Sequence, residues 1–439
     1  MIERFAITEP IVISALLLGC AVIIFYARVE IAAGIYCSAM FWAYNVDVGP
    51  VTFLWVLVGT LLASALVHIV RRRIFRLTLA ERQFSVWLCL WFLWTIMVYI
   101  ENRTTLADLL MKNILLYNVL AFAIIFLFIN DVGMMRRFAY AFIATSLIAG
   151  VASLQFIPEL LDAALRHPSF HLRGLTGINY LTFGTLFALS TIFSLAMILA
   201  RRNKIEALAM SLIAPICAVF LVLTGARQSL LAATIASIIL IVWFIRTRRI
   251  RHGLIVLAIV AIVVIVVVLY SSTALWERWT PLQLQLALGS RQDLWRFGWD
   301  MFTRSPIWGN GLDYSTPEFG TAHNLILDSL ASQGIIGFVF LCGLILFTLR
   351  VARGSWSADG SSELAKWRAA LLAIWVAVFV QTQISGSVAG SWHFFWLSAL
   401  IWRLAMMARQ NNSQPSIVVR PAVDAPKIRP SNSGQDISL

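Results

Sequence analysis

The chain has 439 residues, of which 60% are hydrophobic and only 13% charged, and it contains 17 tryptophans. No soluble domain of this size needs so much apolar surface, so the composition excludes a soluble enzyme. In a soluble protein the formal net charge of +13 would suggest nucleic-acid binding. Here the basic residues lie in short loops between apolar runs, so membrane topology is the better explanation of the charge.

Apolar segments recur along the chain at lengths that suit helices crossing a bilayer, whereas a barrel would show short alternating strands. We therefore predict an all-α polytopic integral membrane protein with about 12–13 transmembrane helices. The predicted segments are residues 11–26, 31–46, 51–70, 84–100, 114–130, 138–157, 178–200, 207–223, 229–245, 253–271, 325–349, 369–386 and 392–408. The second is the least regular, because polar residues interrupt it from Tyr44 onward, and whether it spans decides the side of the N-terminus.

Clusters of lysine and arginine set the expected orientation of these segments. The basic loops lie at 71–76, 136–137, 201–204, 246–251 and 350–353, and all of them fall on one side, which the positive-inside rule makes the cytoplasm. We divide the chain into a membrane domain, residues 1–408, and a polar cytoplasmic tail, residues 409–439, that we expect to be disordered. The opposite side receives the long loop at 271–322.

The long outer loop combines features found nowhere else in the chain. Residues 288–302 have helical spacing with apolar and aromatic faces, which predicts an amphipathic helix on the outer membrane boundary. Beyond this helix Gly309, Gly311 and Gly320 are expected to let backbone and substrate approach closely. His323 follows where the polar loop meets the next apolar segment, and a histidine there can change its protonation near neutral pH.

Topology does not explain the arginines on the outer side. Arg227 lies between two apolar segments with almost no loop, although a charge at membrane depth costs about 2.5–3.5 kcal/mol on insertion scales. Arg291 is expected in the first turn of the amphipathic helix, and Arg173 in a glycine-rich stretch before the seventh segment. Guanidinium groups match phosphate oxygens, so each arginine is a candidate ligand for an anionic group. The alternatives are an interfacial anchor, a solvated helix face and a tight turn, respectively.

Other polar residues on the outer side limit the chemistry. Asn324 is placed to cap the helix that follows His323, and His393 among its aromatic neighbours is interpreted as an interface residue. The outer carboxylates are scattered and unpaired, so we expect no metal site and no cofactor. The cytoplasmic side has no phosphate-binding nucleotide loop, so a glycosyl donor must arrive already activated.

Several motifs together resemble the O-antigen ligase and O-antigen polymerase superfamily. Residues 224–232, TGARQSLLA, resemble its TGSR-x-x-LL element, with Ala226 where serine is usual. SRQDLW at 290–295, SPIWGNGL at 305–312, AHN at 322–324 and QGIIG at 333–337 resemble its series R-x-x-x-W, P-x-x-G-x-G, H-N and G-x-x-G. The stretch from Arg173, RGLTGIN, resembles its arginine- and glycine-rich loop. The order and spacing of these motifs over residues 171–350 make the set more specific than any one of them.

The resemblance implies a GT-C-like bacterial glycosyltransferase of the inner membrane, with its active site facing the periplasm. Such enzymes take a glycan from undecaprenyl pyrophosphate; ligases pass it to lipid A–core, and polymerases of O-antigen or exopolysaccharide pass it to a second lipid-linked repeat. Both alternatives stay open. The resemblance further implies that Arg227 and Arg291 hold the donor pyrophosphate, with Arg173 and Asn324 also binding substrate. His323 would activate the acceptor hydroxyl in an inverting, metal-independent transfer.

A transporter or flippase of lipid-linked glycans or other amphipathic anions is the main alternative, because it also needs outer arginines and many helices. Transporters usually have internal repeats or broken helices with charges at the middle of the membrane. The chain shows no internal repeat, and its unusual residues gather on one side. A membrane scaffold presenting its basic tail is a third alternative, but it leaves His323 and the long loop unexplained.

Overall fold

A computed structural model describes residues 5–7, 10–26, 28–42, 46–48, 51–72, 79–154, 180–200, 202–246, 280–314, 321–356 and 362–413. Four sequence predictions fall outside these residues. They are the apolar segment at 253–271, the role of Arg173, the turn around Gly320, and the tail beyond residue 413.

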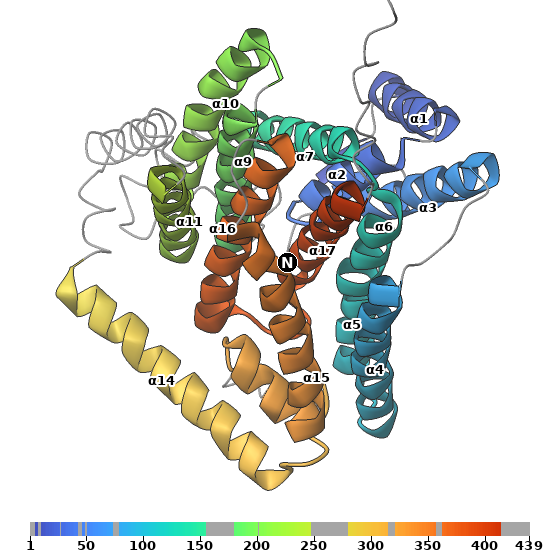
Figure 1. Ribbon diagram of the computed structural model, residues 1–439. Coiled ribbons are helices and arrows are strands. Elements are labelled where there is room, and N and C mark those ends of the chain that lie inside the picture. Colours follow the sequence, from blue (N-terminus) through green and yellow to red (C-terminus); the bar gives the residue numbers. More distant parts are fainter. Residues whose placement is uncertain are drawn as a thin grey trace, which may run out of the picture.

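The described chain is helical almost throughout, as its apolar segments predict, and the all-α polytopic membrane fold is confirmed (Figure 1). The helices are α1 (Pro10–Phe25), α2 (Val29–Ala39), α3 (Phe53–Arg72), α4 (Leu79–Glu101), α5 (Thr105–Asn113), the π-helix η2 (Ile114–Leu120), α6 (Ala121–Phe128), α7 (Val132–Ser153), α9 (Tyr180–Leu199), α10 (Lys204–Leu223), α11 (Arg227–Arg246), α14 (Pro281–Arg304), α15 (Leu325–Trp356), α16 (Glu363–Ser385) and α17 (Trp392–Ser413). The last helix continues past residue 408, where the sequence analysis placed the start of the tail.

A small sheet, which the sequence analysis did not predict, lies beside the helices. Its strands are β1 (Phe5–Ile7), β2 (Val46–Val48) and β3 (Val51–Thr52). β1 pairs with β2 in parallel, and β2 pairs with β3 antiparallel. Strands this short have too few residues for a recognisable alternation of apolar and polar side chains.

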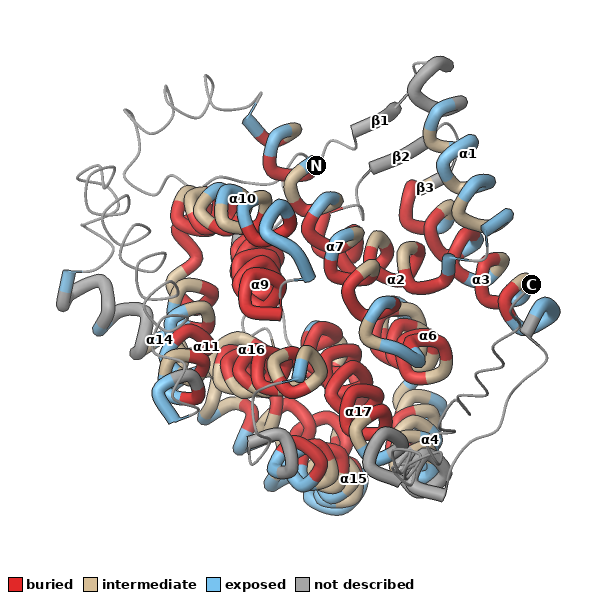
Figure 2. The backbone as a smooth tube through the Cα atoms, turned by 45° about the horizontal axis from the view of Figure 1, so that its top comes forward, coloured by how far each residue is buried: buried red, intermediate tan, exposed pale blue. Residues whose placement is uncertain are grey.

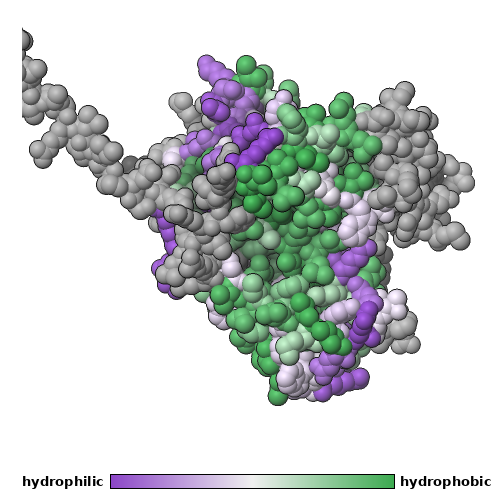
Figure 3. Space-filling model, turned by 90° about the vertical axis from the view of Figure 1, so that its right-hand side faces the viewer, coloured by the Kyte–Doolittle hydropathy of each residue, from purple (hydrophilic) through white to green (hydrophobic). Residues whose placement is uncertain are grey.

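Five helical stretches among the described residues are long and apolar enough to cross a membrane. They are Phe53–Arg71, Thr105–Phe128, Leu181–Leu199, Lys204–Leu223 and Leu325–Arg353. The second joins α5, η2 and α6 without a break, so much of the loop expected before residue 114 is helical. Figure 3 shows one face of the molecule, where a broad apolar surface is bordered by hydrophilic side chains above and below.

The structure clarifies the irregular second segment. α2 has 11 residues, which at about 1.5 Å per residue is half of the ~30 Å hydrocarbon core. It is buried against α3, α6 and α7 instead of facing lipid. A Cβ on Gly34 would lie 2.4 Å from the carbonyl oxygen of Phe138, which shows how closely α2 packs on α7. This helix is therefore an internal element and not an independent span.

Buried residues dominate α9 and α17 and one side of α7 (Figure 2), and aromatic side chains from these three helices pack on one another. Trp396 of α17 packs on Phe138 and Phe142 of α7 and on Phe193 of α9, with ring centroids 5.8–6.5 Å apart. α9 is apolar around its whole circumference, which explains why it is buried on nearly all sides.

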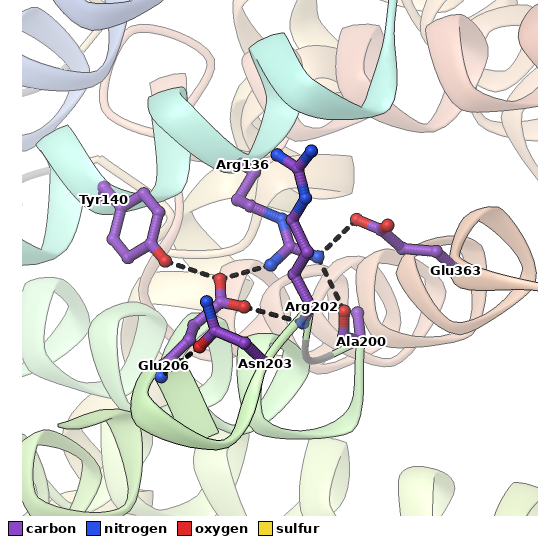
Figure 4. A network of polar contacts seen from close by, with 7 residues as sticks. All are labelled: Arg136, Tyr140, Ala200, Arg202, Asn203, Glu206 and Glu363. Carbon is purple, nitrogen blue, oxygen red and sulfur yellow. Dashed lines mark hydrogen bonds and ion pairs between the residues drawn. The ribbon is translucent and has the colours of Figure 1, made fainter. Parts of the chain in front are cut away.

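Charged residues gather at one end of the bundle, which we call the network end and define by Arg136, Glu206 and Glu363 (Figure 4). Arg136 pairs with both carboxylates and donates to the Ala200 carbonyl oxygen at 2.6 Å. Tyr140 donates to Glu206 at 2.5 Å. This network ties together the starts of α7, α10 and α16 and the end of α9. All four of these segments adjoin loops that the sequence analysis placed on one side.

Candidate functional site

A cavity of about 270 Å³ lies at the ends of α9 and α16 that are remote from the network end. We call it the outer cavity. It is surrounded by the first residues of α9, α11 and α17 and by the last residues of α16. His323 and, from α14, Arg291 complete the wall. The residues that line it include Phe41, Thr185, Gln228, Arg291, His323, Gln381, Trp392 and His393. Segments that are far apart in the sequence, around residues 228, 291, 323, 381 and 393, thus meet at one site.

His323 reaches this cavity from an unusual backbone conformation. It is the only non-glycine residue with positive φ in the described chain, at φ 50°. Histidine tolerates this left-handed region better than most residues, and such conformations cluster at functional sites. The His323 side chain keeps an exposed surface, and its Nδ1 lies 3.5 Å from the Thr321 hydroxyl, at the limit of hydrogen-bond reach. The ring is therefore accessible to a substrate.

A buried hydrogen-bond chain holds the His323 loop in place. The Ala322 amide donates to the Tyr314 hydroxyl at 2.9 Å, and Tyr314 donates to Asp328 of α15 at 2.6 Å. The other Asp328 oxygen accepts from the Val388 amide at 2.6 Å, which ties the α16–α17 loop to the same chain. Sequence reasoning missed Tyr314 and Asp328, since nothing in their spacing shows that they meet.

Asn324 caps α15 as predicted. Its side-chain oxygen accepts from the amides of Ile326 at 3.1 Å and Leu327 at 3.0 Å, and its amide group donates to the Gln383 carbonyl oxygen at 2.9 Å. The cap uses both ends of the side chain. Both ends of the Asn324 side chain are thus bonded within the protein, and its contact with substrate stays a prediction.

The glycine motif allows a close approach of one backbone segment to another. Gly309 packs on the backbone of α15 at the kink that Gly334 makes with φ 65°, and Gly311 packs on Asn102. A Cβ on Gly309 would lie 2.3 Å from the Ser332 carbonyl oxygen, and one on Gly334 would lie 2.2 Å from that of Ile307. The prediction that these glycines allow a close approach is confirmed for the backbone at Gly309, and the approach of substrate stays a prediction. These glycines let the loop dock on α15.

Arg291 lies on the cavity wall together with His323, but its place in the helix was predicted wrongly. α14 begins at Pro281 and not near Ser290, so Arg291 is in the middle of the helix. Proline suits a first helical position, and no breaker follows before residue 289. α14 runs obliquely beside α15 (Figure 1), where Gly298 lies against Ala322 and Phe297 stacks on Tyr314.

Arg291 also affects the protonation of His323. The loss of water around the imidazole and the positive charge of Arg291 both lower the pKa of His323 from its ordinary value. Each favours the uncharged ring, first because burial disfavours a charge and second because like charges repel. His323 is therefore neutral near pH 7, which is the form that can accept a proton.

The other two predicted arginines are placed differently. Arg227 is half-buried at the first residue of α11, but it is the next residue, Gln228, that lines the cavity. Arg173 lies outside the described residues. The structure thus brings Arg291 and His323 together at the cavity, with Arg227 beside it.

Helix termini add to the favourable field for an anion. α9, α11 and α17 begin at the cavity, and α15 begins directly after His323. A helix N-terminus carries a partial positive charge and unbonded amide groups, which favour negative ligands. The end of α16 opposes this effect in part, because a helix C-terminus is partially negative.

Comparison with protein families then identifies part of the chain. The family described as O-antigen ligase matches residues 210–342. This match supports an assignment to the O-antigen ligase and polymerase superfamily. No curated protein matches it. The matched region contains Arg227, Arg291 and His323.

Two cavity residues lie beyond the part matched by the ligase family. His393 was interpreted as an interface residue, but only 8% of it is exposed and it lines the outer cavity. That interpretation is wrong, because Phe41 and Trp392 enclose the ring. Gln381 of α16 was not singled out; it donates to the Thr185 hydroxyl at 2.6 Å and is buried. The sequence signal that could have identified Gln381 is the presence of a glutamine within an otherwise apolar helix.

Proposed function

We propose that this chain transfers a glycan from a polyprenyl pyrophosphate donor to a sugar hydroxyl in the outer cavity. The observation that supports the proposal most is the shared position of Arg291 and His323 on one cavity wall, although they come from α14 and from the loop before α15. A guanidinium group and a neutral imidazole are the two groups that such a transfer needs.

The chemistry follows from these two groups. The neutral imidazole of His323 takes the proton of the acceptor hydroxyl as its oxygen attacks the anomeric carbon. The bond from that carbon to the pyrophosphate oxygen breaks, and the leaving pyrophosphate keeps the electron pair. Arg291, with Arg227 beside the cavity, stabilises the negative charge that gathers there. A single displacement inverts the anomeric configuration, and the scheme assigns no step to a metal ion or cofactor.

The donor we propose is an undecaprenyl-pyrophosphate-linked glycan, and the acceptor is lipid A–core for a ligase or a second lipid-linked repeat for a polymerase. The test is to supply the purified protein with the lipid-linked glycans of its native host and each acceptor separately. We expect a transferred product with one of the two acceptors. A positive control, run in parallel, shows that the supplied donor can be consumed. If that control works and neither acceptor receives glycan from this protein, the proposal is wrong.

The arrangement of charges supports a specific orientation in a bacterial inner membrane. The network end faces the cytoplasm, and the outer cavity faces the periplasm. The basic clusters at 136–137 and 201–204 lie at the network end, and the cluster at 350–353 lies in the loop before Glu363, as the positive-inside rule requires. Single cysteines in a cysteine-free background test this orientation. Thr303→Cys and Lys204→Cys are exposed sites and should react with an impermeant reagent from opposite sides. Labelling of both from one side would overturn the orientation.

The contrast between the two ends also favours transfer over transport. The arginine of the network end is already paired with Glu206 and Glu363. A transporter must carry its ligand past this end, whereas a transferase needs only the outer cavity. The transport alternative therefore requires the network to open, and nothing in the described residues indicates a second arrangement of it.

A further inference from the structure

Buried polar atoms without a partner gather around the outer cavity. Within the described part of the chain, Gln228 Oε1, Gln381 Oε1 and both ring nitrogens of His393 accept or donate no hydrogen bond. All three side chains line the cavity, and each is at least nine-tenths buried. Ser391 Oγ and Gln383 Oε1, which flank the same region, also have no partner among these residues.

Such a cluster needs an explanation. In native proteins about 90% or more of buried polar groups have a hydrogen-bond partner. Most other partnerless side-chain atoms in the described residues are single indole N–H groups spread over several helices. Among the described residues, partnerless amide, hydroxyl and imidazole atoms occur together at this cavity and in the residues beside it. A bound ligand that supplies several hydrogen bonds accounts for this grouping.

The chemistry of these atoms defines the ligand class. The partnerless atoms of Gln228 and Gln381 are amide oxygens, which accept hydrogen bonds, and the neutral ring of His393 offers one donor and one acceptor. Hydroxyl groups of a sugar also donate and accept, whereas pyrophosphate only accepts and is better matched by Arg291. The rings of Phe41 and Trp392, with centroids 4.7 Å apart, add an apolar surface that suits the C–H face of a sugar ring.

The size of the cavity limits how much ligand it can hold. Its volume of about 270 Å³ lies below the roughly 300–1,000 Å³ of pockets for drug-sized molecules. One sugar ring fits such a space, and an oligosaccharide does not. The rest of a glycan would extend outward from it.

We propose that Gln381 and His393 form a sugar subsite that binds the hydroxyl groups of the donor's first sugar, the one bonded to the pyrophosphate. This assignment rests on the proposed function, because Arg291 at the same cavity would hold the attached pyrophosphate. The subsite makes the protein prefer a glycosylated donor to the same lipid without sugar. Gln381 and His393 are specificity-determining residues, and His323 remains the group at the reacting atoms.

The test measures equilibrium binding, not turnover, by native mass spectrometry of the purified full chain. One probe is the pool of undecaprenyl-pyrophosphate-linked glycans from the native host, and the other is undecaprenyl pyrophosphate without sugar. The variants are His393→Phe, which keeps a ring beside Phe41 and Trp392, and Gln381→Met, which keeps the side-chain length. The matched control is His68→Phe, a buried histidine that packs on Phe128 in another part of the bundle.

We expect both cavity variants to bind the glycosylated lipid about 3- to 10-fold more weakly, as the loss of one or two hydrogen bonds predicts, with unchanged affinity for the sugar-free lipid. His68→Phe should bind both probes like the wild type. The subsite is refuted if both cavity variants keep the wild-type preference, or if they lose affinity for both lipids equally. If the wild type binds neither lipid, the proposed function fails as well, which separates the two failures.

Discussion

Both ends of the bundle contain buried polar side chains, but these differ in their hydrogen bonding. At the network end, Arg136 is bonded to Glu206, Glu363 and the Ala200 carbonyl oxygen, and Tyr140 completes the Glu206 site. At the outer cavity, by contrast, buried glutamine and histidine atoms have no partner among the described residues. The difference indicates that the polar groups of the network end stabilise the fold, whereas those of the cavity are available to bind a ligand.

Removal of the His323 imidazole should have the largest effect on transfer. Loss of a general base typically lowers the rate about 10²- to 10⁴-fold. We expect His323→Ala to lose activity by this amount in a purified transfer assay while it still binds donor. His323→Asn should behave alike, and it serves as the backbone control because asparagine also tolerates positive φ. Near wild-type rates in both variants would show that the cavity is not the place of catalysis.

Disruption of the network end should lower stability and leave the chemistry intact. Arg136→Met removes the partner of two carboxylates, one of them buried, and breaking such a pair costs about 3 kcal/mol or more. We expect a clearly lower thermal midpoint in detergent, with near wild-type activity for each folded molecule.

The matched control is Arg103→Met, which breaks a solvent-exposed pair with Asp108 and should change the midpoint little. Equal effects of the two substitutions, or a loss of activity in folded Arg136→Met protein, would remove the contrast between the ends.

Lysine substitutions should distinguish the arginines at the cavity. Arg291→Lys keeps the charge but loses the fork that matches phosphate oxygens. Loss of one charged hydrogen bond predicts about a 10- to 100-fold lower kcat/KM. Arg227 does not line the cavity, so Arg227→Lys should have a smaller effect. Arg296→Lys, on an exposed part of α14, should be near wild type. A greater loss in Arg227→Lys than in Arg291→Lys would shift the anion site toward α11.

The pH dependence gives the smallest but most specific effect. Because burial and the Arg291 charge lower the pKa of His323, the base stays neutral as pH falls to the ordinary histidine value of about 6.5. Transfer should decline only below that pH. Arg291→Gln removes the repelling charge, so the pKa should rise and the acid limb should move to higher pH, whereas Arg291→Lys should leave it in place. An unmoved limb in Arg291→Gln would show that the limb does not report His323.

The sequence predicted the helices well because each span is set by local hydrophobicity, as α9 and α10 show. It also placed Arg291, His323 and Asn324 near one another, since they share the loop motifs. It could not identify His393 or Gln381, which approach the site only through long-range packing of α16 and α17. For the same reason the sequence did not show that Tyr314 and Asp328 hold the His323 loop, or that Gly309 packs on α15.

Photo-crosslinking of the donor tests the central claim most directly, namely that the outer cavity binds its pyrophosphate. The probe is an undecaprenyl pyrophosphate with a diazirine beside the pyrophosphate, added to the purified protein with and without an excess of the unmodified lipid. The account predicts competable labelling of peptides that contain Thr185, Arg291, His323 or His393. Competable labelling at Arg136 and Glu206 instead, or labelling that the unmodified lipid does not compete away, would contradict it.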